Sequence, residues 1–172
     1  MKILVLRLGH RAGRDPRIST HCGLVARALG ANGIVYSGEK DQGLLESIKR
    51  VMEEWGGSFE VSYEKNYMSL IRNWKGKVAH LTMYGVPIQN SIESISKEKN
   101  LLVVIGGEKV PPEVYKISDW NVSITSQPHS EIAALAIFLD RLQRGKELGK
   151  KFTKSRKRIV PQERGKKVIG KT

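Results

Sequence analysis

The chain has 172 residues, which is enough for one domain with a hydrophobic core and short for two. Its formal net charge of +13 predicts a polyanionic partner, either a nucleic acid or an acidic membrane surface. Cys22 is the only cysteine, so we expect no internal disulfide. No apolar stretch approaches the length of a membrane span, and the apolar start of the chain is short and broken by Arg7. We therefore expect a cytoplasmic protein.

Short β-branched runs alternate along the chain with amphipathic stretches. In chain order this pattern predicts strands at residues 3–8 and 34–36, a helix at 41–55, strands at 59–62, 78–82, 101–105 and 122–125, and a helix at 130–143. The run at 101–105 is unbroken and apolar, as in a strand that is buried on both faces of a parallel sheet. The alternation of strands and helices predicts an α/β fold with a mostly parallel sheet.

The composition changes after Arg141. Residues 144–172, called the basic tail below, contain twelve Lys and Arg residues against two Glu, so +10 of the net charge of +13 lies there. Apolar residues such as Phe152, Ile159 and Val168 predict that part of the tail packs as a strand or hairpin. We expect the rest to be mobile until a partner binds.

The loop after the first predicted strand is rich in arginine and glycine. Arg11, Arg14 and Arg17 follow the C-terminal end of this strand, where ligands bind in open α/β sheets. Arginine grips phosphate through two parallel hydrogen bonds, and glycine lets the backbone approach a ligand. We interpret the segment as a ligand-binding loop. The alternative is a solvated basic loop that ends in a helix capped by Ser19 or Thr20.

Two later segments are candidates for binding a ligand through backbone groups. Gly106 and Gly107 follow the most apolar strand, and their turn would expose N–H and C=O groups to a purine edge. Residues 121–131 bring polar side chains to the start of a predicted helix, with Ser130 as its cap. The alternatives are ordinary strand-to-helix junctions, with a proline at the helix start in the first case and Glu131 at the positive end of the helix dipole in the second.

Other catalytic patterns have weaker support. Cys22 beside His21 suggests a nucleophile, but no oriented base is visible, and a lone helical cysteine is typical of a core. The four histidines lack the spacing of metal ligands, so no metal site is predicted. Because neither Gly-x-Gly-x-x-Gly after the first strand nor Gly-x-x-x-x-Gly-Lys-Ser/Thr occurs, a nucleotide-like cofactor is expected late in the chain, around residues 105–130.

Four segments are specific when they are taken together and in order. They are Leu6-Arg7-Leu8-Gly9-His10-Arg11 with the following Arg14-Asp15-x-Arg17-x-x-Thr20-His21, then His80-Leu81-Thr82-Met83-Tyr84-Gly85, then Gly106-Gly107-Glu108-Lys109-Val110-Pro111, and finally Gln127-Pro128-His129-Ser130-Glu131. In this order they resemble the archaeal tRNA (cytidine-56-2'-O)-methyltransferase family of the SPOUT superfamily. The resemblance covers residues 1–143, and the basic tail adds little to it.

The resemblance implies a SPOUT domain at residues 1–143, with a mostly parallel α/β sheet, helices on both faces and a C-terminal deep trefoil knot. It also implies that the knot loops hold S-adenosylmethionine and that the enzyme acts on tRNA as a homodimer. The cofactor pocket is then expected at Leu81, Gly106, Gly107, Glu108, Lys109, Val110, Ile124, Thr125, Ser126, Gln127, Pro128, His129, Ser130 and Glu131. Thr125 and Ser126 stand where the family carries a Gly-Asn pair.

The implied reaction is attack by a ribose 2'-oxygen on the sulfonium methyl group. Arg17 matches the catalytic arginine of the superfamily and would act in its own subunit or in the partner. Because its pKa exceeds about 12, arginine is a poor base, and a second role, in which it holds a phosphate and stabilises an alkoxide, stays open. Residues expected to contact the RNA are Arg11, Arg14, Lys154, Arg156, Lys157 and Arg158.

Two other classes of function remain open at the level of sequence. A non-catalytic RNA-binding α/β protein would account for the charge and the basic tail. An α/β hydrolase or transferase would use Cys22 or His129.

Overall fold

The computed structural model describes residues 1–107 and 109–170. Its helices and strands, with η for a 3₁₀ helix, are β1 (Lys2–His10), α1 (Pro16–Ala28), β2 (Gly33–Gly38), α2 (Gln42–Trp55), β3 (Glu60–Tyr63), α3 (Tyr67–Arg72), β4 (Lys77–Pro87), η1 (Ile88–Asn90), α4 (Ile92–Ile95), β5 (Asn100–Gly106), α5 (Pro112–Ile117), β6 (Trp120–Ser123), α6 (Glu131–Gln143), η2 (Lys146–Gly149), β7 (Lys157–Val160) and β8 (Lys167–Gly170). All six predicted strands and both predicted helices are present, although β6 ends two residues before its predicted end.

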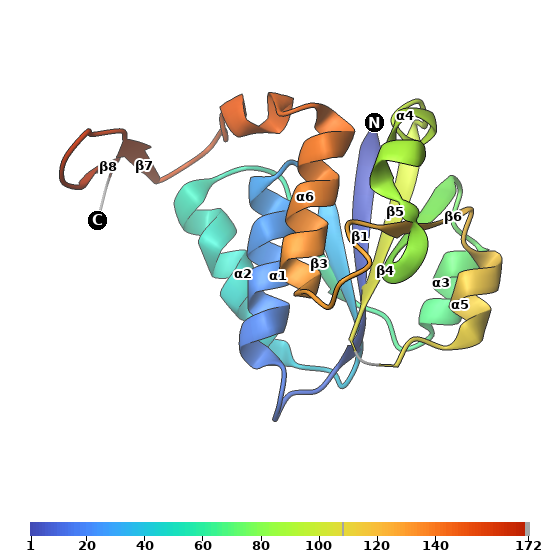
Figure 1. Ribbon diagram of the computed structural model, residues 1–172. Helices are drawn as coiled ribbons and strands as arrows, with labels where there is room; N and C mark the ends of the chain where they lie inside the picture. The colour runs from blue at the N-terminus through green and yellow to red at the C-terminus, as the bar shows by residue number, and fades with distance from the viewer. Residues whose placement is uncertain (108, 171–172) are drawn as a thin grey trace.

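Strands β1 to β6 form one sheet in the order β3-β2-β1-β5-β4-β6, and every neighbouring pair in it is parallel. The predicted α/β fold with a mostly parallel sheet is therefore confirmed. Because parallel strands share one direction, the loops after β1, β2 and β5 emerge at the same edge of the sheet (Figure 1).

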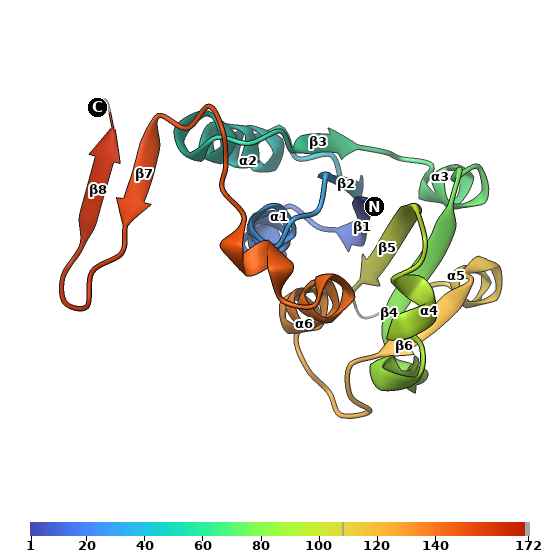
Figure 2. The same ribbon diagram turned by 90° about the horizontal axis from the view of Figure 1, so that it is seen from above.

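Helices cover both faces of the sheet. Ile3 and Val5 of β1 pack in the same core cluster as residues of α1, α2 and α6. Leu6 and Leu8 of the same strand point to the other face, where they pack with Ile71 of α3 and residues of α5 (Figures 1 and 2). The alternation follows from the two-residue period of a strand and explains why β1 and β5 are largely apolar.

The structure corrects the expected start of the helix after the first loop. Pro16 is the first residue of α1, and its missing N–H and fixed φ suit that position. A cap at Ser19 or Thr20 is therefore wrong, since both lie inside the helix, and Arg17 belongs to its first turn rather than to the loop before it. At the other predicted cap, Ser130 does accept a hydrogen bond from the N–H of Ile132.

Strand β6 is contacted twice by the segment that forms β4. Val122 of β6 pairs in parallel with Leu81 and again with Val86, both in β4. Residues 82–85 therefore link two points at which β4 contacts the same residue of β6. Gly85 is needed in this connection, because a Cβ there would lie 2.5 Å from the backbone carbonyl carbon of Asn121. One wall of the site described below is thus made where β4 pairs with β6.

The described part of the basic tail ends in an antiparallel hairpin of β7 and β8, as predicted from its apolar residues. The hairpin projects from the body beside α2 (Figures 1 and 2). Its base is fixed to that helix, because Lys157 pairs with Glu54 at 3.1 Å. Just before the hairpin, the ring centre of Phe152 lies 4.5 Å from the Arg27 guanidinium of α1.

Candidate active site

A cavity of about 500 Å³ lies between β4, the segment after β5 and the start of α6. It is lined by Ile18, His80, Leu81, Thr82, Met83, Tyr84, Gly106, Gly107, Val110, Tyr115, Val122, Ile124, His129, Ser130, Glu131 and Ala134. We call it the knot-side cavity, because it lies where the resemblance to the SPOUT superfamily implies a knot. Its size and its mainly apolar wall with a few polar groups are typical of a small-molecule site.

The knot-side cavity brings together many of the residues expected to bind a cofactor. They are Leu81, Gly106, Gly107, Val110, Ile124, His129, Ser130 and Glu131. The exposed residues Thr125, Ser126, Gln127 and Pro128 are outside its lining, Lys109 borders a neighbouring cavity, and Glu108 lies outside the described residues. The structure therefore brings the two ends of the predicted set to one cavity and leaves the loop between them outside its lining.

The two glycines at the end of β5, Gly106 in the strand and Gly107 directly after it, have different surroundings. A Cβ added to Gly106 would collide with the side chain of Val110, so this glycine is needed for packing. Gly107 has no atom within 4 Å of such a Cβ, although it borders the cavity. A side chain at Gly107 would therefore occupy space that is open for a ligand.

A second cavity, of about 350 Å³, lies where β1 and β2 end. Arg11 and Lys109 both line it, and Gly107 borders this cavity as well as the first. Two cationic side chains thus stand next to the knot-side cavity, as a site for a phosphate-containing substrate requires.

A buried ion pair lies between the knot-side cavity and the second cavity. It was not predicted from the sequence. Arg7 of β1 is 1% exposed, and its Nη2 donates a hydrogen bond to Glu131 Oε1 at 2.9 Å. The same nitrogen lies 3.9 Å from Asp15, which accepts hydrogen bonds from Arg11 at 3.0 and 3.3 Å. An arginine at a core-facing position of an apolar strand was the available signal, because a buried cation requires a partner.

Arg17 lies at the surface beside the knot-side cavity. Its side chain is exposed on the first turn of α1 and is outside the cavity lining, whereas the next residue, Ile18, is part of that lining. The structure therefore brings α1 to the cavity without bringing Arg17 of the same chain into it. Arg14 is also exposed, in the loop before α1.

Neither residue of the alternative nucleophilic site is arranged for catalysis. Cys22 is completely buried in the core, and burial raises the pKa of its thiol to about 12. A thiol in this state is neither accessible nor a thiolate near neutral pH. His129 is exposed, with its Nδ1 2.9 Å from the carbonyl oxygen of Gln127. The structural interpretation of Cys22 as a core residue is confirmed.

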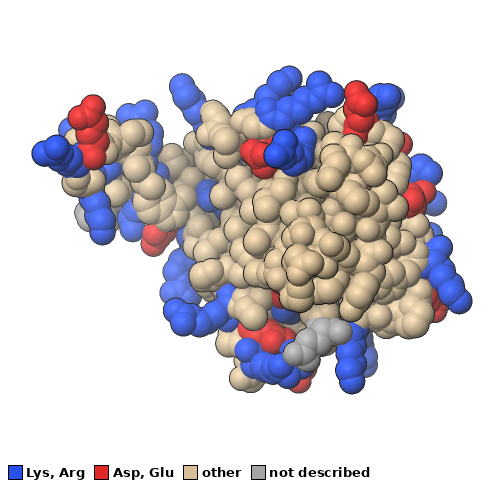
Figure 3. Space-filling model, viewed as in Figure 1, with Lys and Arg blue, Asp and Glu red and all other residues tan. Residues whose placement is uncertain are grey.

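The basic residues of the tail lie apart from both cavities. Lys154, Arg156 and Arg158 are exposed, while Lys157 is partly buried and paired with Glu54. Figure 3 shows blue side chains distributed over the projecting hairpin.

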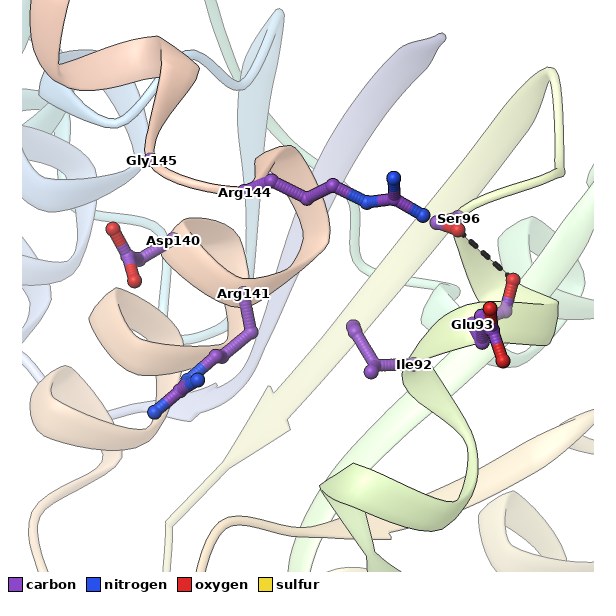
Figure 4. A pocket seen from close by; sticks show the side chains of 7 residues that line it. All are labelled: Ile92, Glu93, Ser96, Asp140, Arg141, Arg144 and Gly145. Atoms are coloured by element: carbon purple, nitrogen blue, oxygen red, sulfur yellow. Dashed lines mark hydrogen bonds between the residues drawn. The ribbon is translucent and has the colours of Figure 1, made fainter.

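A further cavity of about 530 Å³ lies between α4 and the C-terminal end of α6 (Figure 4). Arg141 and Arg144 border it together with Glu93 and Asp140. The two cations there are matched by two acids, and none of the residues predicted for the active site lines this cavity.

The described residues, 1–107 and 109–170, contain no cluster of three or more His, Cys, Asp or Glu side chains suited to a metal ion. None of their helices has the length and hydropathy needed to span a membrane.

Several solved structures of RNA methyltransferases superpose on this fold. An RNA 2'-O ribose methyltransferase superposes with a TM-score of 0.65 at 13% identity, covering 84% of this chain and 57% of the other. The TrmH/SpoU tRNA modifying enzyme of A. aeolicus gives 0.60 at 19% identity, covering 85% and 76%. An AdoMet-bound rRNA methyltransferase from Sinorhizobium meliloti also gives 0.60, at 21% identity, covering 84% and 57%. The chain thus has the fold of this class of enzymes, although it spans little more than half the length of some of them.

Sequence comparison defines the family within this class. Residues 55–169 match the family model for tRNA ribose 2'-O-methyltransferase, aTrm56. Proteins called tRNA (cytidine(56)-2'-O)-methyltransferase are 52% identical over 170 residues in Methanopyrus kandleri and 53% identical over 174 residues in Methanocaldococcus jannaschii. These alignments cover 97% and 98% of this chain, and 96% and 97% of the relatives. The chain belongs to the aTrm56 family of tRNA ribose 2'-O-methyltransferases.

Replacing Asp15 by asparagine should lower stability in a pH-dependent way. The hydrogen bond from Arg11 lowers the pKa of Asp15 below its ordinary value of 3.8. A carboxylate with a depressed pKa stabilises the fold above pH 3.8, and this contribution is lost as the pH falls through the folded-state pKa. Asp15→Asn should therefore cost about 2 kcal/mol at neutral pH, the value for a hydrogen bond between charged groups. In urea unfolding, the difference from wild type should shrink below pH 3.8; a difference that stays constant with pH would contradict this role.

Proposed function

We propose that this protein transfers a methyl group from S-adenosylmethionine to the ribose 2'-oxygen of cytidine 56 in tRNA. The knot-side cavity carries the proposal, because it joins many of the residues expected for the cofactor at one edge of a parallel sheet. Full-length relatives near 50% identity are named for this reaction. With a single buried cysteine and tRNA as its substrate, the enzyme would act in the cytoplasm.

Mass mapping of a tRNA transcript tests this function. After incubation with protein and S-adenosylmethionine, the fragment that contains cytidine 56 should gain one methyl group. A transcript with 2'-deoxycytidine at that position should gain none, since the acceptor oxygen is missing. Methylation of the deoxy transcript to the same extent would refute ribose methylation at this site.

The cavity is chemically suited to S-adenosylmethionine. Gly107 leaves open space, and two buried polar atoms in the wall, His80 Nε2 and Glu131 Oε2, have no hydrogen-bond partner among the described residues. When bound, the cofactor supplies a methyl group that its sulfonium charge makes electrophilic. The residues of the wall would bind and orient it, with backbone groups of Gly106 and Gly107 contributing hydrogen bonds.

We assign the RNA side of the reaction to the neighbouring cationic groups. Arg11 and Lys109 border the second cavity and would hold the backbone phosphate beside the target ribose. Arg17 would donate hydrogen bonds to the 2'-oxygen as negative charge develops on it, because a guanidinium is a strong donor and a poor base. The proton of the 2'-hydroxyl would pass to water.

The same proposal includes a homodimer in which Arg17 acts on the partner's cavity. Figure 3 shows a broad face almost without charged residues over α4 and α6. The exposed apolar residues Ile18, Tyr84, Val86 and Ile137 lie on segments around the knot-side cavity and on α6. A second copy would cover such a patch and would bring its own exposed Arg17 to the cavity.

The deep trefoil knot is part of the proposal as well. Val122 pairs with Leu81 and with Val86, which is expected if the segment around β4 encloses β6. The chain after β6 would then pass through this loop before forming α6. The threading would place three distant segments around one cofactor.

Gly107→Leu should abolish cofactor binding while leaving the protein folded. A Cβ at this position would have no atom within 4 Å, so the leucine side chain can extend into the open space that Gly107 borders. Gly149→Leu is the control, because Gly149 also has open space around it but does not line the cavity. Calorimetry with S-adenosylhomocysteine should show no binding for the first variant and wild-type affinity for the second. Unchanged affinity in Gly107→Leu would move the cofactor elsewhere.

Arg17→Ala should lower turnover at least about 100-fold with little change in cofactor affinity, as expected for a group that acts in the transition state. Mixing this variant with Gly107→Leu tests whether Arg17 acts across the dimer. Random exchange makes about half of the dimers mixed, each with one complete site, so about a quarter of wild-type activity should return. No recovery in demonstrably mixed dimers would place Arg17 in its own subunit's site.

We also propose that the basic tail binds RNA phosphates. Replacing Lys154, Arg156 and Arg158 by glutamine should weaken tRNA binding and reduce the slope of log affinity against log salt by about 0.7–0.9 for each phosphate that the tail no longer neutralises. Lys157 is left in place because it pairs with Glu54. The same change at three lysines near the opposite edge of the sheet, Lys2, Lys97 and Lys99, is the control. Equal salt slopes for wild type and the tail variant would exclude phosphate binding by these residues.

A further inference from the structure

His80 is a buried residue of β4 whose ring orientation is set by its neighbours. Its Nδ1 lies 2.9 Å from Asn121 Oδ1, and its ring packs edge-on against Tyr115 with the ring centres 4.6 Å apart. The side-chain nitrogen of Asn121 donates to the carbonyl oxygen of Tyr115 at 2.8 Å. Since that contact requires the amide nitrogen, the amide oxygen must face the imidazole.

The tautomer of His80 follows from this geometry. The oxygen of Asn121 only accepts, so Nδ1 must carry the proton and Nε2 must present a lone pair. Burial lowers the pKa of His80 and thereby favours this neutral form near pH 7. Nε2 is consequently a fixed hydrogen-bond acceptor.

This acceptor has no partner in the described part of the chain. Nε2 of His80 is buried without a hydrogen bond there, and His80 lines the knot-side cavity. Glu131 Oε2, in the same cavity wall, is also buried without a hydrogen-bond partner among the described residues, because Arg7 bonds only Oε1. Other buried polar atoms of the described residues also lack partners, among them both carboxylate oxygens of Glu147, but His80 Nε2 and Glu131 Oε2 belong to two residues that line the same cavity. Because buried acceptors are usually satisfied, a ligand in this cavity that donates hydrogen bonds would account for both.

We propose that His80 is a cofactor-binding residue whose Nε2 accepts a hydrogen bond from an N–H or O–H group of S-adenosylmethionine. The inference rests on the proposed function and gives one residue of the cavity wall a defined hydrogen bond to the cofactor. S-adenosylmethionine has such donors in its adenine amino group, its ribose hydroxyls and its ammonium group. Asn121 and Tyr115 act as positioning residues, since they hold the ring and fix its tautomer.

Two substitutions separate the acceptor from the rest of the side chain. His80→Asn keeps a donor near the position of Nδ1 for Asn121 and removes the acceptor at Nε2. His80→Gln places an amide oxygen near the position of Nε2. His10→Asn is the matched control, because His10 is also buried, contacts Ser19 and Asp41 through its two nitrogens, and does not line the cavity.

Calorimetric titration with S-adenosylhomocysteine measures the effect without turnover, and thermal unfolding of the free proteins measures folding. We expect at least about 10-fold weaker binding for His80→Asn, as for the loss of a buried hydrogen bond, and a smaller loss for His80→Gln. Free His80→Asn should still unfold in one cooperative transition, at a melting temperature lowered by the lost packing of the ring against Tyr115 and not by the lost acceptor, which bonds none of the described residues. His10→Asn should bind with wild-type affinity.

Equal affinity of wild type and His80→Asn would overturn this inference and leave the proposed function intact. Equal losses in His80→Asn and His80→Gln would also overturn it, because the effect would then follow from the shape of the ring. Failure of the wild-type protein to bind S-adenosylhomocysteine would instead overturn the proposed function, and this inference with it.

Discussion

The buried guanidinium of Arg7 is the constraint on which the site depends. It lies in the interior of the sheet with its side chain 2% exposed, and it makes its one short ion pair among the described residues with Glu131 at the start of α6. Asp15, directly before α1, is the second carboxylate near it. A charge at this depth is tolerated only when it is paired, so Arg7 holds the amino ends of two helices against the same strand. Both helix ends border or adjoin the knot-side cavity.

This constraint also gives Glu131 its orientation. Its Oε1 accepts a hydrogen bond from Arg7. Its Oε2 is buried in the cavity wall and has no hydrogen-bond partner among the described residues. On the RNA side, Asp15 fixes the side chain of Arg11, which borders the second cavity. A chain of charged contacts therefore runs from the proposed phosphate site to the proposed cofactor site. It keeps the polar groups of both sites in place in a cavity wall that is otherwise largely apolar.

The fold could be predicted from the sequence because its strongest signals are local. The apolar run that forms β5 and the amphipathic pattern of α2 each identify one element, and their alternation identifies a parallel sheet. The start of α1 is predicted less well, because Pro16 suits a loop as well as a first helical turn, and Ser19 and Thr20 are residue types that commonly cap a helix.

The candidate site was predicted less completely, because its decisive contacts are between distant residues. Arg7 and Glu131 are separated by 124 positions, and His80 and Asn121 by 41, so no short motif shows that they meet. Resemblance located the segments, but it did not distinguish lining residues such as Ser130 from neighbours such as Gln127. That distinction depends on how the loop before α6 turns, which is set by tertiary packing.

The proposed cofactor site lies in the knot-side cavity, between His80, Gly107 and Glu131. A crystal structure of the protein with S-adenosylhomocysteine tests this placement most directly. We predict ligand density in this cavity, with donor groups of the ligand within hydrogen-bond distance of His80 Nε2 and Glu131 Oε2. Density in the cavity between α4 and α6 instead, beside Arg141 and Arg144, would contradict it.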